Sequence, residues 1–298
     1  MTIPTRTIRA NYPLEEILAF RESGYTDQLL AELAAHLDDT WDLYLYFELS
    51  RWKGNDLAIE PSPRRKLVLC IGDESARTNY PFLPVVDVVF RMYLPENQRG
   101  KIFHIPVGPS HHFAPPATVL PFAERPRNVF FAGNLHQGRA GLYRALTGLP
   151  PLPFAVLHRL RRVLGEQFNN TFPASTIQFS SGFHSGGTPE EYGRNLADSK
   201  IVLCPAGIES PESMRHFEAA SLGCVVLTTP MPDVAVYRHA PFVTLASWWE
   251  LKPTIRQLLS EPNRLLDLHK QTLDWWSNVA NAKAVAHYML HQSSLPTT

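Results

Sequence analysis

The feature that most constrains the fold is the alternation of short apolar runs with helical segments in the second half of the chain. Runs that suit buried strands alternate with segments whose apolar residues repeat at helical spacing. Strands that alternate with helices are joined by right-handed crossovers and pair in parallel, so an open parallel sheet is predicted. The expected strands are 128–132, 176–179, 201–204, 224–227 and 242–245, and the expected helices are 141–146, 154–167, 189–197 and 211–222.

The first half predicts a second parallel sheet. A helical stretch at 14–37, broken near Gly24, is followed by strand-like runs at 43–47, 67–71, 85–90 and 102–107. A Pro-rich stretch at 106–126 follows, which few helices or strands could tolerate. We therefore expect an α/β protein with two doubly wound, Rossmann-like domains facing a cleft. The first expected domain is 1–125 with the linker at 106–126, and the second is 127–298. The second domain ends in two expected helices, 247–259 and 262–290, and the last of these can return to the first domain.

Charge and cysteine content narrow the function classes. Twenty-eight Lys and Arg balance 28 Asp and Glu, so no global field would attract nucleic acid or an anionic membrane, and any anion site must be local. The three cysteines are odd in number and lie in apolar runs, which favours a reducing compartment. No segment has the apolar length of a signal peptide or a membrane span, so a cytoplasmic protein without a transmembrane segment is expected.

The segment 199–229 carries the clearest chemistry, because a buried strand, a Gly-containing loop, a helix and a second buried strand follow one another. Ser210 can cap the helix with Pro211 at its first position. Glu212 and Ser213 would then occupy the first turn, where free N–H groups and the helix dipole favour an anion. This arrangement predicts a diphosphate site.

Arg215 and Glu218 are three residues apart and share a helix face. A guanidinium suits phosphate oxygens and a carboxylate suits ribose hydroxyls, as a nucleoside diphosphate requires. The alternative is an ordinary surface ion pair.

Two runs of residues resemble the exostosin-like glycosyltransferases and their relative, ribitol xylosyltransferase. The first run is Cys204-Pro-Ala-Gly207, Glu209, Ser213-x-Arg215-x-x-Glu218-Ala219 and Gly223-Cys224-Val225-Val226. The second is Val129-Phe-Phe-Ala-Gly-Asn134 with Arg139 and Leu142 downstream, and Tyr192, Leu196 and Ser199-Lys200 add to the likeness. The resemblance covers about 127–243, and the first half of the chain matches no named family.

The resemblance implies a GT-B glycosyltransferase that takes its sugar from a nucleoside-diphosphate donor. It implies a ribose contact for Glu218, a diphosphate contact for Arg215 and a place near the donor sugar for Glu209 and the Gly207 loop. Retaining members of the wider clan carry two Glu residues eight apart, whereas the position eight before Glu218 is Ser210. The spacing from Glu209 is that of the exostosins and indicates an inverting hexosyl- or pentosyltransferase, as used in polysaccharide biosynthesis.

Further donor-binding candidates follow other strands of the second domain. Asn134, His136 and Arg139 come after the strand at 128–132, and Arg139 is a second phosphate candidate. His136 could equally be a loop histidine without function. The Gly-rich loop around His184 is assigned to the nucleobase, with a flexible connector as the alternative.

An inverting transfer needs a general base for the acceptor hydroxyl. Asp73 and Glu74 follow the strand 67–71 and Gly72, and Glu48 follows the strand 43–47, so all three are candidates at strand ends of the first domain. A solvated turn is the alternative for Asp73 and Glu74.

No Asp-x-Asp occurs, so we expect neither a metal nor a cofactor, and His111-His112 is too isolated for a metal site. Cationic groups and a helix dipole would take the place of the metal at the diphosphate. UDP is the expected nucleotide of the donor rather than GDP, and the expected acceptor is a glycan or a lipid-linked glycan. The alternatives are a sugar-nucleotide epimerase or hydrolase, or a non-catalytic sugar-nucleotide-binding protein. A Rossmann oxidoreductase is disfavoured because no Gly-x-Gly-x-x-Gly follows an early strand.

Overall fold

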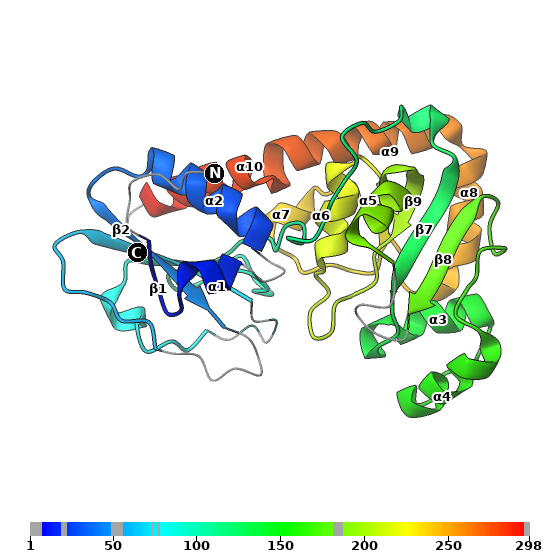
Figure 1. Ribbon diagram of the computed structural model, residues 1–298, viewed down its shortest axis with the longest axis horizontal. Coiled ribbons are helices and arrows are strands. Elements are labelled where there is room, and N and C mark those ends of the chain that lie inside the picture. The colour runs from blue at the N-terminus through cyan, green and yellow to red at the C-terminus, as the bar shows by residue number, and fades with distance from the viewer. Residues whose placement is uncertain are drawn as a thin grey trace. The chain divides into compact units, whose positions relative to one another are not determined.

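The computed structural model describes residues 8–18, 23–48, 56–72, 74, 76, 78–180 and 187–294. The chain divides into two compact units, which are described separately (Figure 1). Unit 1 combines residues 1–111, 232–239 and 277–298, and unit 2 combines residues 112–231 and 240–276. The first passage from unit 1 to unit 2 lies between His111 and His112, within the Pro-rich stretch.

Unit 1 contains a six-stranded sheet with the order β1-β2-β3-β4-β6-β5. All neighbours are parallel except β5, which is antiparallel to β6, and the parallel strands follow one another in chain order. The central strands are almost wholly buried because apolar runs form them. The strands are β1 (Ile8–Ala10), β2 (Trp41–Phe47), β3 (Arg65–Ile71), β4 (Val88–Arg91), β5 (Gln98–Arg99) and β6 (Ile102–His104).

The helices of unit 1 come from both ends of the chain. The expected helix at 14–37 is two helices, α1 (Leu14–Leu18) and α2 (Ser23–His36), so the interruption precedes Gly24. α2 packs against α10 (Ala282–Ser294), and the Tyr25 hydroxyl donates to the Ala280 carbonyl at 3.0 Å. The short α7 (Ala235–Arg238) also belongs to unit 1. The second half of the chain therefore returns twice to complete the first unit.

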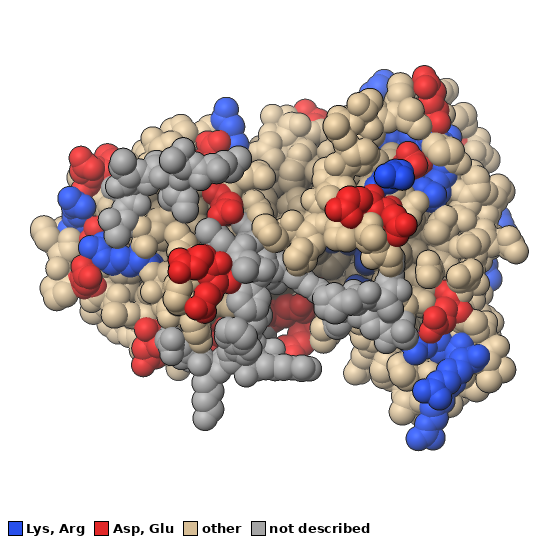
Figure 2. Space-filling model, in the orientation of Figure 1, with Lys and Arg blue, Asp and Glu red and all other residues tan. Residues whose placement is uncertain are grey.

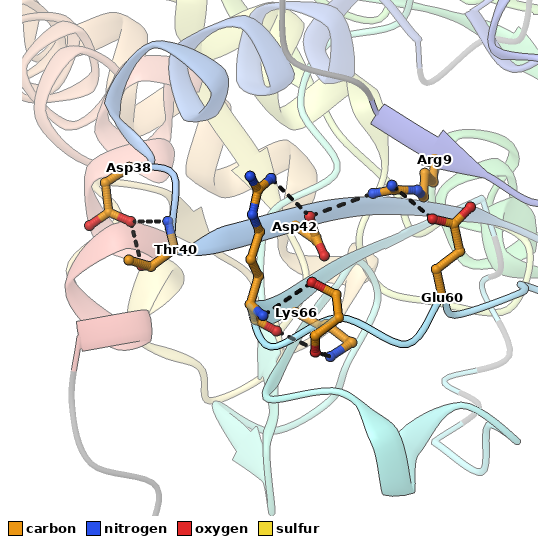
Figure 3. Close-up of polar contacts among 8 residues, drawn as sticks. Arg9, Asp38, Thr40, Asp42, Glu60 and Lys66 are labelled. Atoms are coloured by element: carbon orange, nitrogen blue, oxygen red, sulfur yellow. Dashed lines mark hydrogen bonds and ion pairs between the residues drawn. The ribbon is translucent and has the colours of Figure 1, made fainter.

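A charged cluster ties together the amino ends of β1, β2 and β3 (Figure 3). Asp42 is buried, and its Oδ1 lies 3.5 Å from a guanidinium nitrogen of Arg9 and 3.5 Å from one of Arg64. Arg9 also pairs with Glu60 at 2.8 Å. A buried carboxylate is tolerated when cations surround it, so this edge of the sheet has a structural role.

Unit 2 contains a parallel five-stranded sheet with the order β11-β10-β9-β7-β8. The chain runs from β7 to β8 on one side and then returns to place β9 on the other side of β7. This reversal is the doubly wound arrangement. The strands are β7 (Arg127–Asn134), β8 (Ser175–Ser180), β9 (Ser199–Leu203), β10 (Val225–Thr228) and β11 (Val243–Thr244).

The helices of unit 2 cover its apolar sheet. Thr188 and Glu191 form a capping box at the start of α5 (Pro189–Ala197), which begins and ends as the sequence predicts. The predicted helix 154–167 ends earlier, because Gly165 adopts a φ of 87° and stops α4. The remaining helices are α3 (Ala140–Thr147), α4 (Phe154–Leu164), α6 (Met214–Ser221), α8 (Leu251–Ser260) and α9 (Pro262–Trp275).

The predicted long helix at 262–290 is interrupted. A π-helical segment, Trp276–Ala280, separates α9 from α10, and the chain passes from unit 2 to unit 1 between Trp276 and Ser277. Among the helices within the described ranges, none is both long enough and apolar enough to cross a bilayer.

Candidate functional site

The candidate site lies at the carboxyl ends of β7 and β9. These two strands are neighbours, and the strand order of unit 2 reverses between them. Open α/β sheets bind ligands at such a reversal, because the loops that follow the two strands diverge and leave a crevice. The end of β7 and the segment that follows it carry three of the predicted residues, and the loop and helix after β9 carry seven more. The strand order thus brings together two sets that are far apart in sequence.

On the β7 side, the chain turns into a short 3₁₀ helix, Gln137–Arg139, which leads into α3. Arg139 is buried, and its Nη1 donates to the carbonyl oxygen of Asn134 at 2.9 Å and to the Asn134 side-chain oxygen at 2.6 Å. Asn134, predicted to follow the strand, is its last residue. It holds the Arg139 guanidinium against the strand end.

On the β9 side, α6 carries Arg215 to the same place. Arg215 is buried, and its Nη2 donates to the carbonyl oxygen of Ala132 in β7 at 2.6 Å. Its guanidinium carbon lies 5.0 Å from the ring centre of Phe131, and that of Arg139 lies 5.9 Å from the same ring. Two guanidinium groups therefore meet at the end of one strand, beside one aromatic ring.

His136 adds a neutral hydrogen-bond donor. Its Nδ1 accepts a hydrogen bond from the Gly138 backbone N–H at 3.2 Å, which leaves the ring proton on Nε2. Burial, followed by the charges of Arg139 and Arg215, lowers the pKa of His136 to about 4, so the ring is neutral near pH 7. Nε2 is buried and has no hydrogen-bond partner among the residues that the structure describes.

Arg215 also has buried donor atoms that the rest of the site does not use. Within the described part of the chain, its Nε and Nη1 have no hydrogen-bond partner. Buried polar groups are normally satisfied, and leaving them unpaired is destabilising by about 1–3 kcal/mol each. In the charged guanidinium of Arg215, Nε and Nη1 can donate hydrogen bonds but cannot accept them. The same holds for Nε2 of His136 when the neutral ring carries its proton there. The complementary ligand is therefore an anion that accepts several hydrogen bonds.

Glu218 lies one turn further along α6 and is also buried. Its Oε2 accepts a hydrogen bond from the Tyr192 hydroxyl in α5 at 2.8 Å. Burial and the neighbouring Glu218 raise the pKa of Tyr192, so the phenol keeps its proton and donates it. Because Arg215 and Glu218 are both buried, they are not an exposed ion pair.

The start of α6 differs from the prediction. The helix begins at Met214 with Ser213 as its N-cap residue, so Ser210 does not cap it and neither Glu212 nor Ser213 lies in its first turn. The cause is local, because the Ser210 hydroxyl accepts a hydrogen bond from the Glu212 N–H at 3.1 Å and holds these residues in a turn. Ser213 makes no side-chain capping bond, and its hydroxyl lies 3.0 Å from Nδ1 of His216 instead. Glu212 is buried in this turn.

The loop between β9 and α6 contacts the loop after β7. A Cβ on Gly138 would collide with the carbonyl oxygen of Gly207, so glycine allows the close approach of the two loops. Glu209, predicted to lie near the donor sugar, is exposed in this loop.

The remaining predicted residues lie elsewhere or outside the described ranges. Asp73 and His184 lie outside the described residues. Glu48 directly follows β2 and is half-buried, and Glu74 follows β3, so both lie at the carboxyl edge of the sheet in unit 1.

Neither a family model nor a curated protein matches the sequence. Among solved structures, the sucrose-phosphate synthase from Thermosynechococcus elongatus is 13% identical with a TM-score of 0.45, over 94% of this chain and 79% of that chain. AviGT4, a glycosyltransferase involved in avilamycin A biosynthesis, is 15% identical with a TM-score of 0.44, over 91% of this chain and 89% of that chain. The pneumococcal O-GlcNAc transferase GtfA, in complex with UDP and GlcNAc, is 12% identical with a TM-score of 0.40, over 91% of this chain and 60% of that chain. At these values the likeness is one of architecture, and the chemistry of the site follows from its own residues.

Sequence reasoning missed three contributors to the site. Gly133 lets both guanidinium groups approach β7, because an added Cβ would lie 2.6 Å from Nη1 of Arg139 and 3.0 Å from Nη2 of Arg215. Gly138 allows the loops to meet, and Tyr192 holds Glu218. The glycine before Asn134 was visible in the sequence, whereas the Tyr192 contact depends on the packing of α5 beside α6. No group of three or more His, Cys, Asp or Glu side chains that could hold a metal ion occurs in the described ranges.

Proposed function

We propose that this chain is an inverting GT-B glycosyltransferase that transfers a hexosyl or pentosyl group from a nucleoside-diphosphate sugar to a hydroxyl of a glycan or lipid-linked glycan. The observation that carries the proposal is the set of buried donors on Arg139, Arg215 and His136 at the strand-order reversal of unit 2. A diphosphate supplies acceptor oxygens and the negative charge that two buried guanidinium groups favour.

The neighbouring groups extend the site beyond the diphosphate. Glu218, fixed by Tyr192, is suited to accept hydrogen bonds from ribose hydroxyls, and it lies one turn from Arg215 on α6. The geometry of Ser213-x-Arg215-x-x-Glu218 is the support for an exostosin-like donor site. UDP is the proposed nucleotide, and the two guanidinium groups would take the role of a divalent metal.

In the proposed reaction, a base removes the proton of the acceptor hydroxyl while its oxygen attacks the anomeric carbon of the donor sugar. The bond between that carbon and the diphosphate oxygen breaks, and the diphosphate leaves with the bonding electrons. Arg139 and Arg215 stabilise the charge that develops on the leaving group. Attack from the opposite face inverts the anomeric configuration, and NMR of the product checks this outcome.

Glu48, Glu74 and Asp73 remain the proposed bases. Each follows a strand of unit 1 at its carboxyl end, where α/β proteins place reacting groups. Substituting the base by its amide should leave nucleotide affinity unchanged and lower turnover by roughly 10²-fold or more. If Glu48→Gln, Glu74→Gln and Asp73→Asn all retain turnover, the base lies elsewhere or the chain binds sugar nucleotides without catalysis.

The decisive experiment is calorimetric titration of UDP and GDP in the presence of EDTA. Wild-type protein should bind, and Arg215→Ala should weaken binding by about 1.5–3 kcal/mol, the contribution of hydrogen bonds to a charged group. Arg127→Ala is the control, because Arg127 is a half-buried arginine of unit 2 at the amino end of β7, the end opposite the site, and donates to Thr176 Oγ1 at 2.9 Å and to the Asn195 carbonyl at 2.8 Å. Its nucleotide affinity should be unchanged. Binding that appears only with magnesium or manganese contradicts the metal-free site.

A further inference from the structure

One helix of unit 2 has an exposed face of unusual composition. α4 is anchored by Leu157, which is buried, and by Arg161, which is buried and pairs with Glu166. Figure 1 shows α4 at the edge of unit 2, beyond α3. Figure 2 shows blue side chains gathered over this segment at the lower right of the view. The exposed basic residues of α4 are Arg159 and Arg162.

The exposed face combines these charges with apolar side chains. Val163 is 84% exposed, the highest value among the large apolar side chains that the structure describes, and Val156 is 41% exposed. At 100° per residue, Arg162, Arg159, Val163 and Val156 follow one another around the helix on the exposed side. The sequence of α4 contains no Asp or Glu. A basic strip therefore runs beside an aliphatic strip.

This combination selects one kind of partner. Basic side chains beside aliphatic side chains on one helix face match an anionic lipid surface, where headgroups carry the negative charge and acyl chains lie just beneath. An acidic protein segment would complement the arginines but would leave Val163 and Val156 without an apolar partner. Because the whole chain has no net charge, attraction to such a surface has to come from a local feature of this kind.

We propose that α4 docks unit 2 on anionic phospholipid bilayers. The helix lies along the interface, with Arg159 and Arg162 among the headgroups and Val156 and Val163 inserted between them. The inference depends on the exposed face of α4 alone and is independent of the nucleotide site.

Co-sedimentation with vesicles tests the proposal. The 298-residue chain should bind vesicles of phosphatidylcholine and phosphatidylserine in equal parts, and should not bind vesicles of phosphatidylcholine alone. Removing each arginine should weaken binding by roughly fivefold, the share of one basic residue at such a surface. Reversing both charges, Arg159→Glu with Arg162→Glu, should abolish it. Val163→Ser should weaken binding several-fold without changing its salt dependence.

Matched variants separate this face from general electrostatics. Lys252→Glu with Arg256→Glu makes the same change in charge on α8 and should leave vesicle binding unchanged, and Arg159→Lys with Arg162→Lys should retain it. UDP titration and the thermal midpoint report whether each variant is folded. The proposal is overturned if wild-type protein does not sediment, if it sediments equally with neutral vesicles, or if the charge-reversed α4 variant still binds. The proposal is also overturned if Val163→Ser weakens vesicle binding but neither arginine substitution does. Complete displacement of the protein from the vesicles by polyglutamate would indicate an acidic protein partner instead.

Discussion

Gly133 lies where two guanidinium groups approach one strand. An added Cβ would lie 2.6 Å from Nη1 of Arg139 and 3.0 Å from Nη2 of Arg215, so any larger residue displaces both groups. Gly133→Ala should therefore weaken UDP binding by roughly tenfold, the equivalent of one hydrogen bond to a charged group. Calorimetry measures this change. The control is Ala155→Gly, which changes one methyl group on the exposed face of α4, a helix that carries no residue of the candidate site, and should leave affinity unchanged.

Tyr192 holds the Glu218 carboxylate, so under the proposed function it would act on the nucleotide through Glu218. Tyr192→Phe removes the 2.8 Å hydrogen bond to Glu218 and keeps the ring that packs near Phe130. We expect UDP affinity to fall by about 1 kcal/mol. If Glu218 binds the ribose, wild-type protein prefers UDP over its 2′-deoxy analogue, and Glu218→Gln reduces that preference. An unchanged preference in Glu218→Gln would remove the ribose from the proposed role.

At the scale of single elements, His216 links α6 to β10. It is fully buried, and its Nε2 lies 2.9 Å from the Thr228 hydroxyl. Burial lowers its pKa to about 4, while the unfolded chain has an ordinary pKa near 6.5. Between these two values the unfolded chain binds more protons, so stability rises with pH across this window and is lost as the pH falls from about 6.5 to 4.

His216 should therefore lower the free energy of unfolding by roughly 3 kcal/mol on acidification across that window. Chemical denaturation at a series of pH values measures this slope. His216→Gln should flatten the slope but not remove it, because the pKa of His136 is also lowered to about 4. An equally steep slope in the variant would mean that other groups dominate the acid response.

The elements differ in how far the sequence predicts them. The bounds of α5 were predicted to the residue from the alternation of strands and helices, and a capping box of Thr188 and Glu191 fixes its start in the structure. The predicted start of α6 was wrong. Ser210, Pro211 and Ser213 are all residue types that favour a helix start, and it is the turn held by the Ser210 hydroxyl that makes the helix begin after Ser213. The π-helical segment and the short α7 left no periodic signal. Arg215 and Glu218 were proposed from one segment of sequence, whereas their approach to Arg139 and Tyr192 depends on strand order and helix packing, which no local pattern encodes.

At the scale of the whole molecule, nucleotide binding should appear as added stability. A ligand that binds only the folded chain adds about 2.7 kcal/mol at a hundred times its dissociation constant. UDP with EDTA should therefore raise the thermal midpoint of the wild-type protein, and the same UDP concentration should raise that of Arg215→Ala by clearly less. Because the proposed nucleotide site belongs to unit 2, a probe in that unit, such as Trp248 fluorescence in a variant lacking the other tryptophans, should report the shift. A midpoint that UDP does not move would contradict a preformed nucleotide site.

The discontinuity of unit 1 has a consequence for how the protein is made. α2 leaves the ribosome well before its packing partner α10, because residues 37–281 separate the two helices. At about 5–20 residues per second, α2 waits on the order of tens of seconds for that partner. During this time α2, whose Leu29, Leu30 and Leu33 are all buried in the finished protein, lacks one of the helices against which it packs. The nascent chain thus lacks the contact between α2 and α10 for as long as residues 37–281 are being translated, and a message truncated before α10 yields a chain that never forms it.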